Sequence, residues 1–278
     1  MQRIGIALGG GGVRGLAHVL ALRVLDDLGV RPALIAGTSI GAIIGAAYAA
    51  GIPARELHDL CLRHTLKRGD GLLEVIGKRA ELRRWLDAFS VERGRGGLLS
   101  PDGMFGYLFA GLPVRRFEQL RIPLRVIATD YWAATEVVFR SGDLEPALRA
   151  SMAFPGVFAP AEIDGRVLVD GGVVNNVPYD HLQQECDLVI AVDVAKTREP
   201  ERETVPGIID AITGAYDIMH DAELGRRMRH SPPDIYVRPQ IQGIRVFDFT
   251  SVEEVFRQAA PAMRRLRGEL ERRLRAAG

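Results

Sequence analysis

The chain has 278 residues, and its 36 lysines and arginines against 35 aspartates and glutamates give a formal net charge of +1. Hydrophobic residues make up 47% of the sequence, enough to bury a large core in one domain spanning residues 1–278, which excludes a disordered or collagen-like chain. A net charge near zero argues against nucleic acid as a partner. Two widely spaced cysteines, Cys61 and Cys186, predict no disulfide framework or zinc site and favour the cytoplasm.

Short apolar runs alternate with helical patterns along most of the chain. Ile4–Leu8 is predicted to be a buried strand, followed by glycines and a helix from about Arg14 to Leu28 with Gly29 as its stop. A second strand is expected at residues 34–36 and a small-residue helix at residues 39–50. Further strands are predicted at residues 124–129, 137–140, 167–169 and 188–194. This alternation predicts a three-layer α/β fold, in which helices flank a mostly parallel central sheet.

Two segments depart from that alternation. Residues from about 52 to 117 hold several helical patterns, and we interpret them as an inserted helical cap. The cap is rich in arginine with interleaved aromatic residues, so peripheral contact with anionic lipid headgroups is one hypothesis and a solvated helix face is the other. A C-terminal helix is expected over about residues 252–276, with Ser251 and Glu254 in the pattern of a capping box. The charge-free stretch 32–54 is too interrupted by glycine and proline for a membrane span.

Four consecutive glycines, residues 9–12, follow the first strand. Such a run lets backbone N–H groups converge on an anion at the start of a helix. Gly10, Gly12 and Gly15 match a dinucleotide fingerprint literally, but no acidic residue ends the next strand, and no Gly-Lys-Ser/Thr follows for a Walker loop. An oxyanion hole is the third interpretation and needs a nearby nucleophile; a tight turn alone is the fourth.

A nucleophile candidate, Ser39, follows the second strand in the pattern Gly37-Thr38-Ser39-Ile40-Gly41. Gly-x-Ser-x-Gly between a strand and a helix is typical of a strained turn whose glycines let the two elements approach closely. A plain helix N-cap is the alternative role for this serine.

A base candidate, Asp170, ends the strand at residues 167–169 and precedes Gly171 and Gly172. A carboxylate at a strand end followed by small residues can meet another group at close range, although an ordinary Asp-Gly turn explains the same letters. The order Ser39, Asp170, His181 leaves a triad with histidine open.

Taken together and in this order, the glycine run, Gly-x-Ser-x-Gly and Asp-Gly-Gly resemble the patatin-like phospholipase family, bacterial branch. The resemblance spans about residues 4–193 and includes the stretch from Ala150 to Pro160. One departure is Gly9, where the plant storage members have aspartate. The resemblance implies a Ser–Asp dyad without histidine, with Ser39 as nucleophile and Asp170 as general base. It also implies an oxyanion hole from Gly10, Gly11 and Gly12, and supporting roles for Arg14, Gly37, Gly41 and Gly171.

The function implied by this resemblance is a serine acyl-ester hydrolase acting on lipids, of the lysophospholipase or phospholipase A type. The substrate would be a lipid or another acyl ester, and no metal or other cofactor is expected. A soluble carboxylesterase for short esters, a non-catalytic regulatory module that kept the fold and, more distantly, a dinucleotide oxidoreductase are the alternatives. We expect a cytoplasmic location, with the cap as the candidate for membrane contact; nothing in the sequence indicates the oligomeric state.

Overall fold

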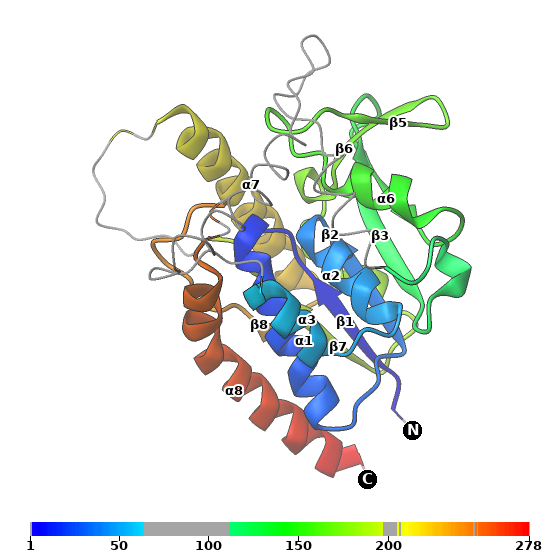
Figure 1. Ribbon diagram of the computed structural model, residues 1–278, viewed down its shortest axis with the longest axis vertical. Coiled ribbons are helices and arrows are strands. Elements are labelled where there is room, and N and C mark those ends of the chain that lie inside the picture. Colours follow the sequence, from blue (N-terminus) through cyan, green and yellow to red (C-terminus); the bar gives the residue numbers. More distant parts are fainter. Residues whose placement is uncertain are drawn as a thin grey trace.

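A mixed eight-stranded sheet with helices on both faces forms the centre of the molecule (Figure 1). The computed structural model describes residues 2–63, 112–196, 205, 207–246, 248 and 250–277. Most of the expected cap at residues 52–117 therefore lies outside the described residues. The predicted fold class, a mostly parallel sheet with flanking helices, is confirmed.

The parallel strands form the centre and one edge of the sheet, and the antiparallel ones lie along the other side. The strands are β1 (Ile4–Leu8), β2 (Leu34–Thr38), β3 (Leu124–Asp130), β4 (Thr135–Phe139), β5 (Ala161–Ile163), β6 (Arg166–Asp170), β7 (Leu188–Val192) and β8 (Ile235–Val237). Strand β1 pairs in parallel with β2 on one side and β7 on the other. Strand β2 then pairs in parallel with β3, and β7 with β8. Strands β4 and β6 run antiparallel to β3, and β5 runs antiparallel to β6. The short strands β5 and β8 were not predicted.

Helices connect most of these strands. They are α1 (Ala17–Asp27), α2 (Ile40–Ala49), α3 (Ala54–Arg63), α6 (Leu144–Ser151), α7 (Ile208–His230) and α8 (Val252–Ala277), with short 3₁₀ helices at Gly12–Leu16, Phe117–Gln119, Gly171–Val173 and Tyr179–His181. Helix α1 ends as expected, because Gly29 adopts a left-handed φ of 66° and its N–H donates to the Asp26 carbonyl. No helix in the described part of the chain combines the length and apolar run that a bilayer span requires.

The start of α8 corrects one detail. The capping-box prediction is wrong, because the Ser251 N–H donates to the Asp248 carbonyl oxygen at 3.2 Å and not to Glu254. The Ser251 hydroxyl donates to Asp248 Oδ2 at 2.8 Å. The Glu254 carboxylate instead accepts bonds from Arg257 and Gln258 within the helix. Asp248, three residues before the serine, therefore accepts the Ser251 N–H that Glu254 would accept in a capping box.

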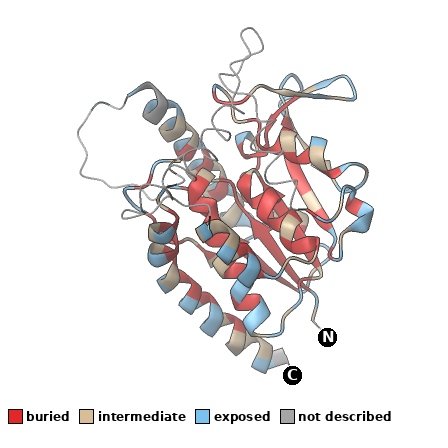
Figure 2. Ribbon diagram, viewed as in Figure 1, coloured by how far each residue is buried: buried red, intermediate tan, exposed pale blue. Residues whose placement is uncertain are grey.

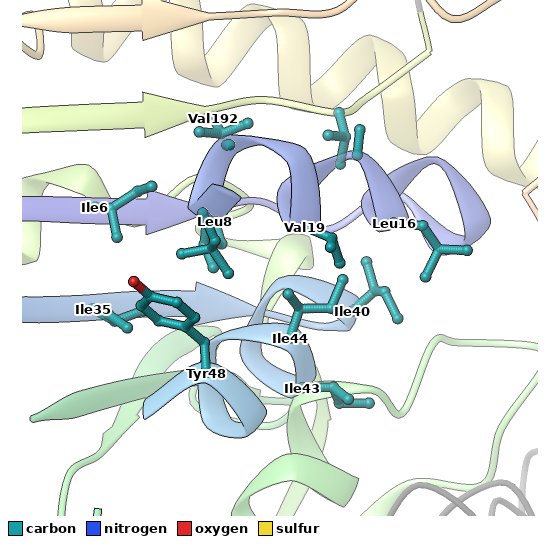
Figure 3. Close-up of a cluster of buried hydrophobic side chains, with 14 of the residues drawn as sticks. Ile6, Leu8, Leu16, Val19, Ile35, Ile40, Ile43, Ile44, Tyr48 and Val192 are labelled. Carbon is teal, nitrogen blue, oxygen red and sulfur yellow. The ribbon is translucent and has the colours of Figure 1, made fainter. Parts of the chain in front are cut away.

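The core consists of two layers, one on each face of the sheet. Alternate residues of a strand point to opposite faces, so Ile6 and Leu8 pack with α1, α2 and α8, whereas Ala7 faces Leu224 of α7. Figure 2 shows the central strands buried along their whole length. Figure 3 shows Ile6 and Leu8 in one cluster of buried side chains with Ile40 and Ile44 of α2. Because helices pack on both faces of the sheet, the residues at the carboxyl ends of its strands are held in fixed positions.

The pairing of β3 determines what lies at that edge. Val126 and Ile127 pair with β2 and with β4, so those two strands lie on opposite sides of β3. The next residues, 128–130, keep β4 as one partner and take β6 as the other. Strand β6 therefore occupies the place beside β3 where β2 has ended. Thr38 is opposite Ile127 and Asp170 opposite Ala128, so the carboxyl ends of β2 and β6 meet head on.

Candidate active site

Ser39 occupies a strained turn between β2 and α2. Its φ of 56° and ψ of −127° lie where side chains other than glycine are rarely found. The turn is held by two hydrogen bonds: the Ser39 N–H donates to Ser151 Oγ at 2.8 Å, and Thr38 Oγ1 donates to the Asn175 carbonyl at 2.9 Å. Ser39 is half-buried, whereas Ser151 beneath it is fully buried. The geometry is that of a nucleophile elbow.

Glycine is required on both sides of this serine. A Cβ on Gly41 would lie 2.1 Å from the Leu8 carbonyl oxygen, and a Cβ on Gly37 would lie 2.6 Å from Ala42 Cα. Both contacts are with backbone atoms, which cannot move aside without displacing β1 or α2. The small residues of Gly-x-Ser-x-Gly therefore let the strand and the helix approach, as the sequence pattern predicts.

We expect Ser39→Gly to raise the free energy of unfolding by roughly 1 kcal/mol relative to Ser39→Ala. Alanine keeps a Cβ in the unfavourable conformation, whereas glycine adopts a positive φ without steric cost, which outweighs its larger entropy in the unfolded chain. Urea denaturation of the two variants measures the difference. Equal midpoints, or a more stable alanine variant, would show that the turn stores no strain.

Asp170, the last residue of β6, lies beside the elbow and is only 1% exposed. Its Oδ1 accepts a bond from the Gly172 N–H at 2.8 Å and from the Tyr216 hydroxyl at 3.4 Å, and the Ser39 side chain lies near enough to affect its pKa. Burial raises the pKa of Asp170 to about 6, although the Gly172 N–H and the side chains of Ser39 and Tyr216 act to lower it. The structure thus brings the two predicted members of the dyad together. The carboxyl group of this pair, that of Asp170, has a pKa near neutral pH.

Gly171 allows the aspartate to take this position. A Cβ there would lie 2.2 Å from the Ile127 carbonyl oxygen of β3. The residue is a point of close backbone contact, and its supporting role in catalysis stays a prediction.

The glycine turn lies against the nucleophile, since a Cβ on Gly10 would lie 3.1 Å from Ser39 Cβ. Asn176 clamps this turn: the Gly10 N–H points to the Asn176 carbonyl and to its Oδ1, at 3.2 and 3.1 Å, and Asn176 Nδ2 donates to the Gly10 carbonyl. The first of the three predicted oxyanion donors is thus already engaged. The N–H groups of Gly11 and Gly12 have no acceptor among the described residues.

Arg14 points to α7. Its side chain is buried, and its guanidinium lies 3.7 Å from the Asp217 carboxylate. Burial lowers the pKa of Arg14, and the charges of Asp217 and Asp193 oppose that effect. The arginine therefore ties the helix that follows the glycine turn to α7.

Neither His181 nor His18 contacts the dyad among the described residues. His181 Nε2 is 3.0 Å from Glu136 Oε2, and none of the contacts among the described residues joins it to Asp170 or Ser39, so the triad interpretation is not supported. His18 lies behind the glycine turn, with its Nε2 2.7 Å from the Gly9 carbonyl. Burial lowers the pKa of His18 to about 4, which keeps the ring neutral.

Among the residues that the structure describes, two clusters of carboxylates and imidazoles have ligand atoms close enough to share an ion: Glu136, Asp180 and His181, and Asp193, His220 and Asp221. In each cluster an arginine already pairs with a carboxylate, Arg227 with Asp180 at 2.8 Å and Arg238 with Asp221 at 2.7 Å. A guanidinium thus neutralises charge where a metal would. That no metal is needed stays a prediction.

Three residues of the site were not predicted as part of it. Ser151 lies within the stretch from Ala150 to Pro160, and Asn176 lies four residues after Gly172, the last residue of the Asp-Gly-Gly motif. Polar residues in or near these motifs were the signal that could have identified them as part of the site. Tyr216 comes from α7, a helix that was not predicted, and no local pattern marks it.

A strained serine between a parallel strand and a helix, beside a glycine turn and a buried aspartate, defines the class of α/β proteins with a nucleophile elbow. Residues 6–182 match the family described as patatin-like phospholipase. The chain belongs to this family.

Relatives extend the comparison. An uncharacterized NTE family protein of Mycobacterium tuberculosis is 36% identical over 212 residues, which are 74% of this chain and 53% of that protein. The lysophospholipase NTE1 of Kluyveromyces lactis is 25% identical over 281 residues, 92% of this chain and 18% of that protein. The chain thus spans about half the length of the mycobacterial relative. The crystal structure of VipD from Legionella pneumophila shares the fold, with a TM-score of 0.50 and 11% identity over 94% of this chain and 66% of that one.

Proposed function

We propose that the protein is a serine acyl-ester hydrolase acting on lipids, of the lysophospholipase or phospholipase A type. The observation that carries the proposal is that the Ser39 side chain lies near enough to the buried Asp170 carboxyl group to affect its pKa, which is about 6. A general base works best when its pKa is near the working pH, and a serine hydroxyl needs such a base to become a nucleophile. The name of the lysophospholipase relative supports lipid as the substrate class.

In the proposed reaction Ser39 Oγ attacks the ester carbonyl, and its proton passes to Asp170. The tetrahedral oxyanion is held by N–H groups of the glycine turn, of which Gly11 and Gly12 have no other described acceptor. One such donor is typically worth about 3 kcal/mol in the transition state. The alcohol departs with the proton from Asp170 and leaves an acyl-enzyme on Ser39. Water then attacks the acyl carbon and gives a proton to Asp170, which returns it to Ser39 as the fatty acid is released.

Gly10 takes part in this proposal in a different way from the other two glycines. Its N–H is shared by two oxygens of Asn176, so it can stabilise an oxyanion only if that clamp loosens. Membrane contact through the basic cap stays a prediction, because residues 64–111 lie outside the described part of the chain.

A fluorophosphonate probe tests the nucleophile directly. We expect the wild-type protein to be labelled at pH 8, with the modified peptide mapping to Ser39, and Ser39→Ala to remain unlabelled. Labelling of another residue, or none in a folded protein, would contradict the proposal and favour a non-catalytic module. A series of acyl esters of increasing chain length then separates a lipase-type enzyme, which prefers long chains, from a carboxylesterase for short esters.

A further inference from the structure

Helix α7 lies outside the segment that matches the family, yet it contributes three polar side chains to the site. The Tyr216 hydroxyl is 3.4 Å from Asp170 Oδ1. Asp217 pairs with Arg14 at 3.7 Å, and His220 Nε2 lies 3.2 Å from Asp193 Oδ1. The three contacts join one turn of α7 to the ends of β6 and β7 and to the glycine turn.

These polar contacts, more than apolar packing, determine where α7 sits at this end. Large apolar residues of the same region are exposed: Ile212 by 44%, Ile218 by 51% and Met219 by 58%. Asp217 and His220, in contrast, are buried. A helix whose charged and polar residues face inward while its apolar residues face outward is oriented by its hydrogen bonds and ion pairs.

The Tyr216 hydroxyl lies between two groups of the site. Besides Asp170 Oδ1, it is 3.5 Å from Asn176 Oδ1, the atom that accepts from the Gly10 N–H. Burial, together with the charges of Asp170 and Asp217, raises the pKa of Tyr216 well above its ordinary value, so the phenol keeps its proton and acts as a donor. The ring packs against Phe154, with 5.1 Å between ring centroids.

The backbone opposite the phenol leaves room for it. A Cβ on Gly172 would lie 1.6 Å from the Tyr216 hydroxyl oxygen, a distance that no two non-bonded atoms tolerate. The same Gly172 donates its N–H to Asp170 Oδ1. A tyrosine hydroxyl and a backbone N–H thus converge on one oxygen of the carboxylate.

We infer that Tyr216 is a positioning residue of the active site, which holds Asp170 Oδ1 so that Oδ2 is left to take the proton of Ser39. The inference rests on the proposed function. By touching Asn176 as well, the same hydroxyl links the base to the clamp on the glycine turn. Tyr216 forms no bond to the substrate in this role and acts through Asp170.

Tyr216→Phe tests the inference, because it removes the hydroxyl and keeps the ring. Loss of a hydrogen bond that favours the carboxylate raises the pKa of Asp170, so the acid limb of the pH profile is expected to move up by roughly half a pH unit. A several-fold fall in kcat is expected, with KM nearly unchanged. The rate of fluorophosphonate labelling of Ser39, followed from pH 5 to 9, gives the same limb without any choice of substrate.

Tyr48→Phe is the matched control. It removes another tyrosine–aspartate bond, from Tyr48 to Asp26 at 2.5 Å, near the opposite end of α2 from Ser39. We expect it to leave the pH profile of labelling unchanged, whatever it does to the unfolding midpoint. A Tyr216→Phe profile that coincides with the wild type, or a Tyr48→Phe profile that moves equally, would overturn the inference. Unimpaired turnover in Ser39→Ala would instead overturn the proposed function.

Discussion

Ser39→Ala is expected to lower acyl-ester hydrolysis by about 10⁴-fold or more, the scale on which loss of a nucleophile acts in serine hydrolases. The physical reason is that the other two hydroxyls at this turn are engaged: Thr38 donates to the Asn175 carbonyl, and the fully buried Ser151 accepts the Ser39 N–H. Alanine retains the Cβ, so the fold and the clamp on the glycine turn are left in place.

The measurement is steady-state hydrolysis of a long-chain ester, with circular dichroism to show that the variant is folded. Thr38→Ser offers a control at the neighbouring position, because it keeps the hydroxyl that donates to the Asn175 carbonyl. We expect that variant to stay within about threefold of the wild type, since a neutral hydrogen bond contributes about 1 kcal/mol and is retained. A Ser39→Ala enzyme with near-normal rates would remove this serine from the mechanism.

Asp170→Asn is expected to lower turnover by about 10³-fold or more, because an amide cannot accept the proton of Ser39.

In the wild type the carboxyl group of Asp170 predicts how kcat/KM depends on pH. Asp170 must be ionised to act as a base and its pKa is about 6, so kcat/KM is expected to rise tenfold per pH unit below that value and to level off above it. A wild-type profile that stays flat down to pH 4 would contradict the assignment.

The same substitution is expected to make the protein more stable at pH 8. Burial raises the pKa of Asp170 from 3.8 to about 6, so the folded state binds more protons than the unfolded state between these values. The stabilising contribution of this group is therefore full below pH 3.8 and is lost as pH rises through 6. Asparagine has no charge to desolvate, so Asp170→Asn should gain on the order of 1–3 kcal/mol at pH 8. Urea denaturation at pH 4 and pH 8 measures it; the gain should shrink at pH 4.

Local pattern was sufficient for the elbow. Gly-x-Ser-x-Gly between an apolar run and a helical pattern places Ser39 without any knowledge of distant residues, because the turn is built by steric contacts of its own glycines with β1 and α2. The central strands were predictable for a similar reason, since a strand buried on both faces is apolar at every position. Helix α7 was missed because its apolar residues do not follow one face.

What the chain alone determined is the list of parts: a strand and glycine run, a strained serine, and an aspartate before two glycines. What only the tertiary structure decided is how they meet. Asp170 reaches Ser39 because β6 runs antiparallel to β3 and ends beside it where β2 ends. The five residues of β6 do not by themselves determine in which direction the strand runs in the sheet. Asn176 and Tyr216 join the site through contacts spanning 166 and 46 residues of sequence. Such contacts form only when the sheet and α7 pack together, because they depend on burial and long-range geometry and not on any local periodicity.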